Sequence, residues 1–294
     1  MSGQMSAATA IWREYDQTGL DAQYNNRKRF PDYIDRFAAW GEWSQATRGK
    51  LNHRADVAFG EHPMESLDIF PAEESGGPIY VFIHGGYWYS LDKNDFSYLA
   101  EGMMPHGVTT VVNNYVLAPH GDMDEIVRQN RAALAWIWQN ARDFGADPDR
   151  IYVTGHSAGG HLAAMLLATD WPNFQTGLPQ DLVKGACAIS GLFELEPIRL
   201  SYLNNRLGMD QEMSQRNSPA LLKYPIAAPL LLVVGKDESD EYHRQSQAMA
   251  EKWGTLGYEH ELFVPDGLDH FAVVDSLIDP HSDLVRRQLN AIPG

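Results

Sequence analysis

The five residues Gly155-His156-Ser157-Ala158-Gly159 constrain this chain most strongly, because of what lies on either side of them. Residues 150–154 form a β-branched and aromatic run typical of a buried parallel strand, and residues 161–168 are rich in helix-forming side chains. Glycine at both ends lets a strand and a helix approach closely, so the serine between them is held in a sharp turn with its hydroxyl exposed. The pattern predicts a nucleophile elbow at Ser157.

Segments typical of strands and helices alternate along the rest of the chain. Eight runs have the composition or alternation of β-strands: residues 55–59, 66–70, 79–83, 108–112, 150–154, 185–190, 229–235 and 260–265. Four segments have helical periodicity or composition: residues 122–144, 161–168, 240–253 and 280–291. This alternation predicts the α/β class, with a mostly parallel central sheet covered by helices on both faces. Ligands of such sheets bind at the carboxyl ends of the strands.

Two further segments lie outside this alternation. Residues 10–50 are polar and aromatic with helical spacing, and they are too few to form a core of their own, so we expect helices packed on the body. Residues 192–224 are irregular and rich in proline, and an insertion at such a place often covers a site. We therefore predict a single domain over residues 1–294, with both segments forming a partial cap.

Composition excludes several classes of function. A formal net charge of −16 disfavours nucleic acid and anionic membranes as partners. No apolar window approaches the length of a membrane span, and residues 1–5 lack the pattern of a signal peptide. The single cysteine, Cys187, cannot form an internal disulfide, which fits a cytoplasmic location. Motifs typical of metal and dinucleotide sites are missing, so we expect neither a metal nor a cofactor. The oligomeric state stays open, with a homo-oligomer among the alternatives.

A serine hydroxyl becomes a useful nucleophile only when a base takes its proton, and that base needs a third group to orient it. His270 is the candidate base because it follows the last predicted strand directly, in the loop 267–271. The other late histidines, His243, His260 and His281, fall inside or at the start of predicted helices and strands.

The acid is expected in the loop after the strand 229–235, before the histidine in the chain. Two neighbouring carboxylates, Asp237 and Glu238, both fit this position. Neighbouring side chains point in opposite directions, and the pattern of residues does not choose between them.

An oxyanion site needs N–H donors aimed at the charge that develops on the substrate carbonyl. Gly85 and Gly86 follow the inner strand 79–83 and can turn their amides toward the elbow. The amide of Ala158, directly after the nucleophile, is the other expected donor.

The residues His84-Gly85-Gly86-Tyr87-Trp88, together with residues 155–162, resemble the α/β-hydrolases related to hormone-sensitive lipase. They resemble in particular the arylformamidase (kynurenine formamidase) group, which carries H-G-G-x-W. The resemblance continues through residues 190–197 and 241–246 and covers about residues 20–275. The acid of that family, usually Asp, corresponds to Glu238. The resemblance therefore favours Glu238, with Asp237 as the alternative.

The resemblance implies an α/β-hydrolase that uses no cofactor and cleaves small aryl amides or esters, notably N-formyl aryl amides, through an acyl-enzyme. The alternative is a short-acyl carboxylesterase of the hormone-sensitive-lipase type with the same residues. Tyr87 and Trp88 are candidate substrate contacts, although Trp88 equally suits packing within the loop. A non-catalytic binding scaffold is a third hypothesis, and the presence of every catalytic part argues against it.

Overall fold

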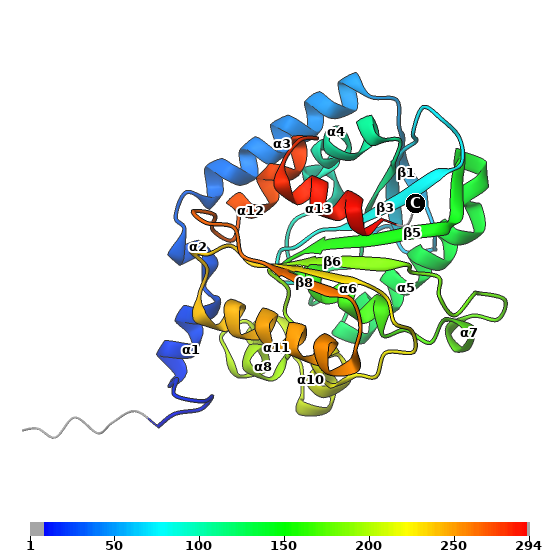
Figure 1. Cartoon of the computed structure of the whole chain (residues 1–294). Coiled ribbons are helices and arrows are strands. Elements are labelled where there is room, and N and C mark those ends of the chain that lie inside the picture. Colours follow the sequence, from blue (N-terminus) through cyan, green and yellow to red (C-terminus); the bar gives the residue numbers. More distant parts are fainter. Residues whose placement is uncertain (1–8, 293–294) are drawn as a thin grey trace, which may run out of the picture.

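The computed structural model describes residues 9–292 and has three layers, with a central sheet between two layers of helices (Figure 1). The sheet holds eight strands in the order β1-β2-β4-β3-β5-β6-β7-β8. Their bounds are β1 Arg54–Ala58, β2 Ser66–Phe70, β3 Gly77–Ile83, β4 Thr109–Asn113, β5 Ala146–His156, β6 Gly185–Ile189, β7 Leu230–Val233 and β8 His260–Phe263. β2 pairs antiparallel with β1 and β4, and all other neighbours are parallel. The prediction of a mostly parallel sheet is confirmed.

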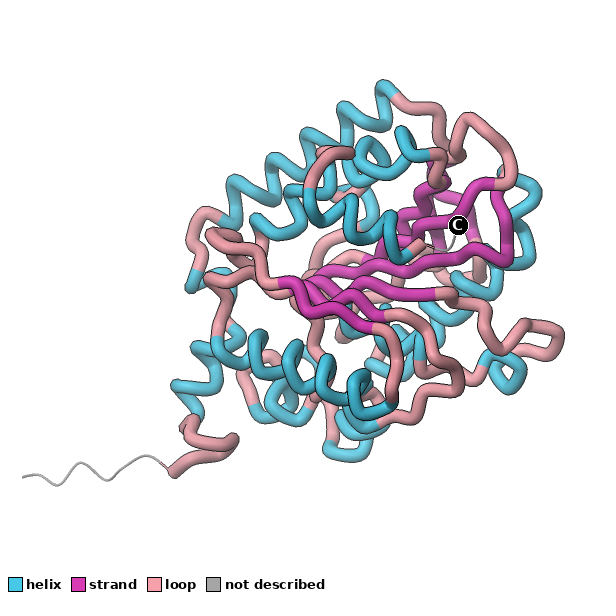
Figure 2. Tube along the Cα trace, in the orientation of Figure 1, coloured by secondary structure: helices cyan, strands magenta, loops and turns pink. Residues whose placement is uncertain are grey.

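Helices cover both faces of the sheet, as Figure 2 shows. The helix bounds are α1 Gln17–Tyr24, α2 Asn26–Arg29, α3 Tyr33–Lys50, α4 Ala100–Met103, α5 Met123–Asn140, α6 Ala158–Leu167, α7 Trp171–Phe174, α8 Glu196–Leu200, α9 Asn204–Leu207, α10 Gln211–Arg216, α11 Asp240–Leu256, α12 Ala272–Asp275 and α13 Asp283–Ala291. Short 3₁₀ turns are η1 Lys93–Asp95, η2 Ser97–Leu99, η3 Met104–His106, η4 Ala141–Phe144, η5 Pro219–Leu221 and η6 Ser276–Ile278. One face carries α3, α4, α12 and α13, and the other carries α1, α5, α6, α8 and α11.

The strand β3 illustrates why the sequences of the inner strands are continuously apolar. Successive side chains of a strand point to opposite faces of the sheet. Ile79, Val81 and Ile83 accordingly enter the core beneath α5 and α6, while Tyr80 and Phe82 enter the core beneath α3 and α13. All five side chains are fully buried. A strand covered on both faces leaves no position for a polar residue, so its sequence does not alternate.

Two sequence predictions differ from the structure. The strand expected over residues 150–154 begins earlier, at Ala146, and its first residues lie before an irregularity in the pairing with β3 between Gly77 and Ile79. Proline lacks an N–H and is tolerated where the ladder is interrupted. The segment 192–224 was expected to be irregular, yet it contains the helices α8, α9 and α10. Helices of four to six residues are too short to leave a readable period in the sequence.

The N-terminal helices and the segment between β6 and β7 lie against each other. The Gln17 side chain donates to the carbonyl of Leu200 over 3.0 Å, and the backbone N–H of Tyr202 donates to Asp21 over 2.8 Å. Residues 1–5, on which the signal-peptide prediction depends, lie outside the described part of the chain. Within residues 9–292, none of the helices has the length and apolar character needed to cross a membrane.

Candidate active site

Ser157 stands between the last residue of β5 and the first residue of α6. Its φ of 57° and ψ of −116° lie where non-glycine residues are rare, so the turn is strained. A Cβ on Gly159 would lie 1.9 Å from the carbonyl oxygen of Ile83, so only glycine lets the helix approach β3 this closely. The Ser157 N–H donates to the carbonyl of Ile189 over 2.7 Å and fixes the turn against β6. The local geometry is that of a nucleophile elbow.

His270 and Glu238 form a buried pair at the carboxyl end of the sheet. The Nδ1–H of His270 donates to Oε2 of Glu238 over 2.7 Å. A carboxylate can only accept, so the bond places the proton of a neutral imidazole on Nδ1 and leaves Nε2 as a proton acceptor. His270 and Ser157 line the same cavity. These contacts give His270 the tautomer that a general base for a serine needs.

Asp237 and Glu238 occupy different environments in the structure. Asp237 is exposed, whereas Glu238 is 6% exposed and contacts His270. The second carboxylate oxygen of Glu238 accepts from the Ser190 hydroxyl over 2.6 Å and from the Gly235 N–H over 2.7 Å. Of the two carboxylates that the sequence left open, only Glu238 is brought to the histidine.

Ser190 and His156 also hold the pair in place, and the sequence analysis did not single them out. Ser190 has a φ of 52° at the end of β6, a conformation that turns its hydroxyl to Glu238. His156 donates from Nε2 to the carbonyl of His270 over 2.7 Å. Burial lowers the pKa of His156 well below its usual range, and the neighbouring His270 lowers it further. His156 is therefore a neutral donor that positions the backbone of His270. Two features of the sequence could have identified these residues. Ser190 begins a Ser-Gly pair directly after a strand, and His156 occupies the variable position of the elbow motif.

The loop after β3 carries the other predicted residues. Gly86 has a φ of 104°, and a Cβ there would lie 2.1 Å from the carbonyl oxygen of Ser90. The Ser90 hydroxyl donates to the Gly86 carbonyl over 2.9 Å and accepts from the Arg27 guanidinium over 2.8 Å. The N-terminal segment thus braces this loop. Gly86 lines the cavity that holds Ser157.

The two other predicted oxyanion donors lie directly beside the nucleophile. Gly85 packs against Ser157, since a Cβ on it would lie 3.1 Å from the Ser157 Cβ. Ala158 is fully buried and is the first residue of α6. The N–H groups of a helix's first turn have no acceptor within the helix, so they are suited to a developing negative charge.

Tyr87 and Trp88 lie in different places. Tyr87 lines the cavity, and its hydroxyl donates to the carbonyl of Tyr24 over 2.6 Å. Trp88 is fully buried outside the cavity lining, and its indole N–H donates to Nδ1 of His161 over 3.2 Å. His161 in turn donates from Nε2 to the carbonyl of Asn217 over 2.8 Å. In this structure Trp88 connects the loop after β3 to α6.

His161 predicts a pH dependence of stability. Burial lowers its pKa from 6.5 to about 4, against a smaller opposing effect of its bond to Asn217. Between these pH values the unfolded chain binds more protons than the folded chain, so this contribution to stability is complete above pH 6.5 and is lost as the pH falls toward 4. From pH 7 to 4.5 the loss is about 2 kcal/mol.

Urea unfolding at the two pH values measures this loss. His161→Gln removes the titrating group, so the variant should lose about 2 kcal/mol less than the wild type over the same pH range. Carboxylates titrate alike in both proteins and cancel in the comparison. An equal loss in both proteins would mean that His161 does not titrate in this way.

The cavity at Ser157 is narrow and is lined in part by the N-terminal helices. The space open to the centre of a water-sized group is about 20 Å³, and about 10–15 Å³ on that measure holds one water. Asn26 and Arg27 of α2, together with Phe37 and Trp40 of α3, form part of its wall. The Ser157 residue is only 2% exposed, so its hydroxyl opens into this cavity and not onto the surface. Helices distant in sequence form part of the cover over Ser157, which the local sequence pattern did not reveal.

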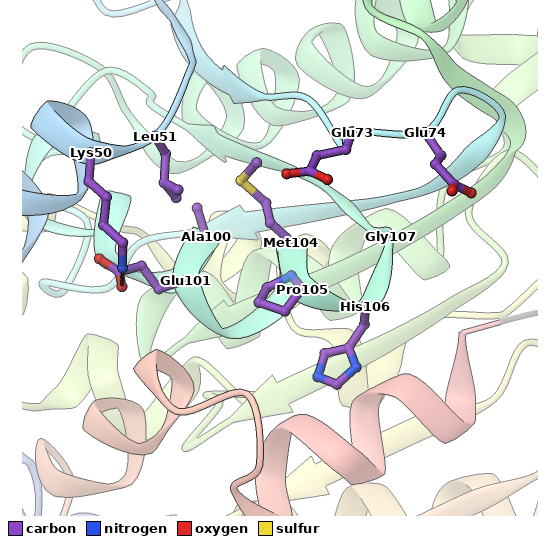
Figure 3. A pocket seen from close by; sticks show the side chains of 10 residues that line it. All are labelled: Lys50, Leu51, Glu73, Glu74, Ala100, Glu101, Met104, Pro105, His106 and Gly107. Carbon is purple, nitrogen blue, oxygen red and sulfur yellow. Dashed lines mark hydrogen bonds and ion pairs between the residues drawn. The ribbon is translucent and has the colours of Figure 1, made fainter.

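A larger hollow of about 650 Å³ lies elsewhere on the molecule. Figure 3 shows its lining, which comes from the end of α3, the loop before β3, and α4 with the turn that follows. Its charged residues include Lys50 and Glu101, which pair with each other over 2.6 Å. None of the predicted site residues lines this hollow. Among the described residues, no three His, Cys, Asp or Glu side chains gather as metal ligands would.

Comparisons with known proteins find related sequences and structures with the same fold. The model of the BD-FAE family matches residues 67–253. Kynurenine formamidase of Danio rerio is 31% identical in an alignment that covers 96% of this chain and 98% of that protein. A crystal structure from Silicibacter sp. TM1040, provisionally named a thioesterase, has a TM-score of 0.80 and 29% identity, covering 91% of this chain and 97% of that one. An esterase of Pyrobaculum calidifontis, with a TM-score of 0.72 and 17% identity over 88% of this chain and 90% of its own, shares the fold.

Proposed function

The chain belongs to the BD-FAE family of α/β-hydrolases and is an arylformamidase-like hydrolase, and from this premise we propose that it cleaves small N-formyl aryl amides. Ser157 is the nucleophile, His270 the base and Glu238 the acid that orients His270. Ser157 Oγ attacks the formyl carbon while His270 Nε2 takes its proton. The carbon–nitrogen bond then breaks, and the nitrogen takes that proton as it leaves. Water, activated by His270, releases formate from the serine ester.

We assign the stabilisation of the oxyanion to the N–H groups of Gly85, Gly86 and Ala158. Gly86 lines the cavity and the other two residues lie beside Ser157. Donors fixed in a water-poor cavity stabilise a developing charge more than the same donors in water would. Of the two candidate substrate contacts, Tyr87 and Trp88, we propose that Tyr87 contacts the substrate. Trp88 is assigned to supporting the loop, because its indole N–H is bonded to His161.

The size of the cavity is the observation that carries the proposal. Only about 20 Å³ beside the nucleophile is open to the centre of a water-sized group, so the free space there favours a small acyl group such as formyl. The aromatic side chains of Phe37, Trp40 and Phe271 line the cavity and limit the space for a longer acyl group. Forcing extra methylenes into a packed space costs free energy.

A short-acyl carboxylesterase with the same residues is the second candidate. It is favoured by the esterase of Pyrobaculum calidifontis, which shares this fold. Amide and ester hydrolysis differ in the protonation of the leaving group and not in the identity of the nucleophile. The two functions therefore have to be separated by substrate and not by inhibition of Ser157.

Matched substrates provide the test. We expect kcat/KM to be highest for N-formylkynurenine and N-formyl anilides, and to fall by about 10-fold or more for each methylene added to the acyl group. The ester series p-nitrophenyl formate, acetate and butyrate should show the same dependence on size. Rapid cleavage of the butyrate without detectable turnover of formyl amides would contradict the proposal and support the carboxylesterase.

Partner and location follow as parts of the same proposal. We propose a small aryl amide or ester as the partner and the cytoplasm as the location. The chain's one cysteine, Cys187, is buried in β6, so no internal disulfide ties the fold to an oxidising compartment. The oligomeric state, for which a homo-oligomer is one alternative, is tested by sedimentation of the purified protein.

A further inference from the structure

Asn26 is a buried polar residue that lines the cavity, and it has no role in the proposed mechanism. It is the first residue of α2, is 2% exposed, and lines the cavity together with Ser157 and His270. Its side-chain N–H₂ faces two hydroxyls, at 3.0 Å from Tyr242 and 3.3 Å from Tyr87. No sequence motif drew attention to it.

The hydrogen bonds around Asn26 fix which way its amide points. The Tyr87 hydroxyl donates its only proton to the carbonyl of Tyr24 over 2.6 Å. The Tyr242 hydroxyl, 2.7 Å from that of Tyr87, must then donate to it. Both hydroxyl oxygens can therefore only accept from Asn26, which must turn its N–H₂ toward them. The carbonyl oxygen Oδ1 consequently points away from the two tyrosines.

Oδ1 of Asn26 is buried and accepts no hydrogen bond from any described residue. A buried carbonyl oxygen without a hydrogen-bond donor is energetically unfavourable, and most such groups in native proteins have a partner. The residue lies on the side of the cavity near His270, since the ring of Tyr242 lies 4.8 Å from the ring of His270 between centroids. His270 is the group that protonates the leaving atom in the proposed mechanism, so Asn26 lines the cavity on the side where the leaving group is protonated.

The end of α1, just before Asn26, is held in place by bonds that do not involve Oδ1. The Ser239 hydroxyl donates to the carbonyl of Gln23 over 2.7 Å, and the Glu241 N–H donates to the Gln23 side chain over 3.2 Å. The Tyr24 hydroxyl donates to Glu241 over 2.7 Å. These bonds hold the segment on the start of α11. The unused acceptor therefore has no part in fixing the segment, and a ligand donor is the partner it lacks.

We propose that Asn26 Oδ1 accepts a hydrogen bond from the N–H of the scissile amide and so makes the enzyme selective for amides over esters. The inference rests on the proposed function. Once the Ser157 Oγ–carbon bond has formed, the nitrogen must present its lone pair to the protonated His270, and its N–H must point elsewhere. Asn26 holds that N–H. The carbon–nitrogen bond then breaks with its electron pair on nitrogen, which takes the proton from His270 and leaves as the amine. An ester oxygen carries no hydrogen and would leave Oδ1 unpaired.

Formanilide and phenyl formate test this directly, because they differ only in NH against O. Asn26→Ala should lower kcat/KM for formanilide by about 10- to 100-fold and change that for phenyl formate by less than about threefold. Asn25→Ala is the matched control, since this neighbour caps the same helix by accepting from the Lys28 N–H over 3.1 Å. It should keep the amide-to-ester ratio of the wild type.

Asn26→Asp keeps an acceptor oxygen at the same position, so it should preserve the amide-to-ester ratio even where both rates fall. If Asn26→Ala fails to fold, a fall of about 10-fold or more in the amide-to-ester ratio of Asn26→Asp relative to the wild type would overturn the inference. An equal loss on both substrates in Asn26→Ala, or a ratio in Asn26→Asp that falls as far as in Asn26→Ala, would overturn the inference and leave the proposed function standing. A wild type that cleaves phenyl formate but no formanilide would overturn both.

Discussion

Replacing Ser157 by alanine is expected to lower kcat for N-formyl anilides by a factor of roughly 10⁵ to 10⁶. The proposed mechanism has no other nucleophile in the cavity, and the remaining donors and pocket supply only the residual rate. The fold should survive, because the bond that fixes the turn to Ile189 comes from the backbone N–H and alanine retains it. The measurement is steady-state turnover together with a thermal unfolding curve.

A fluorophosphonate probe extends this test to the hypothesis of a non-catalytic scaffold. The wild type should be labelled at Ser157, and Ser157→Ala should not be labelled. Ser190→Ala is a suitable control, since Ser190 is a buried serine whose hydroxyl is bonded to Glu238. It should still be labelled at Ser157, at a lower rate. Full activity in Ser157→Ala, or an unlabelled wild type, would contradict the mechanism.

Glu238→Gln is expected to lower kcat by roughly 10³ to 10⁴, whereas Asp237→Asn should stay within about twofold of the wild type. Glutamine has nearly the shape of glutamate but carries no charge, so it stabilises neither the tautomer of His270 with its proton on Nδ1 nor the imidazolium that forms during reaction. Asp237 is exposed, so its charge is screened by solvent. The two variants are isosteric replacements at adjacent positions, which makes each the control of the other.

The same pair can be measured in the burst phase, where release of the aryl product reports acylation alone. Glu238→Gln should reduce the burst rate, because the base acts in the first step. A large loss in Asp237→Asn with little change in Glu238→Gln would transfer the role of the acid to Asp237. That result would also mean that the loop rearranges when substrate binds.

The strands were the most predictable part of the fold. The run 79–83 is apolar without interruption, and it forms the inner strand β3 because it is covered on both faces. The ends of elements were less predictable. The helix expected over residues 122–144 ends at Asn140 and continues as a 3₁₀ turn, because the last turn of a helix often tightens. The helix expected over residues 161–168 begins at Ala158, inside the motif itself.

The acid shows where sequence reasoning reached its limit. Asp237 and Glu238 are neighbours in one loop, and composition or spacing describes both equally well. The choice in the structure depends on the turn in which the Glu238 N–H donates to the carbonyl of Gly235 over 3.1 Å. That turn directs the Glu238 side chain to Ser190, a residue 48 positions earlier in the chain. The family resemblance had favoured the same residue.

What the sequence by itself determined was local: a strand, a tight turn with a serine, a helix, and a histidine in the loop after the last strand. These features depend on neighbouring residues, whose preferences can be read along the chain. Only the tertiary structure decided which distant side chains complete the site. Asn26 meets Tyr242 across 216 positions, and His156 holds the backbone of His270 across 114. Such contacts depend on how helices and strands pack together. The residues next to one partner do not indicate which distant residue it will contact.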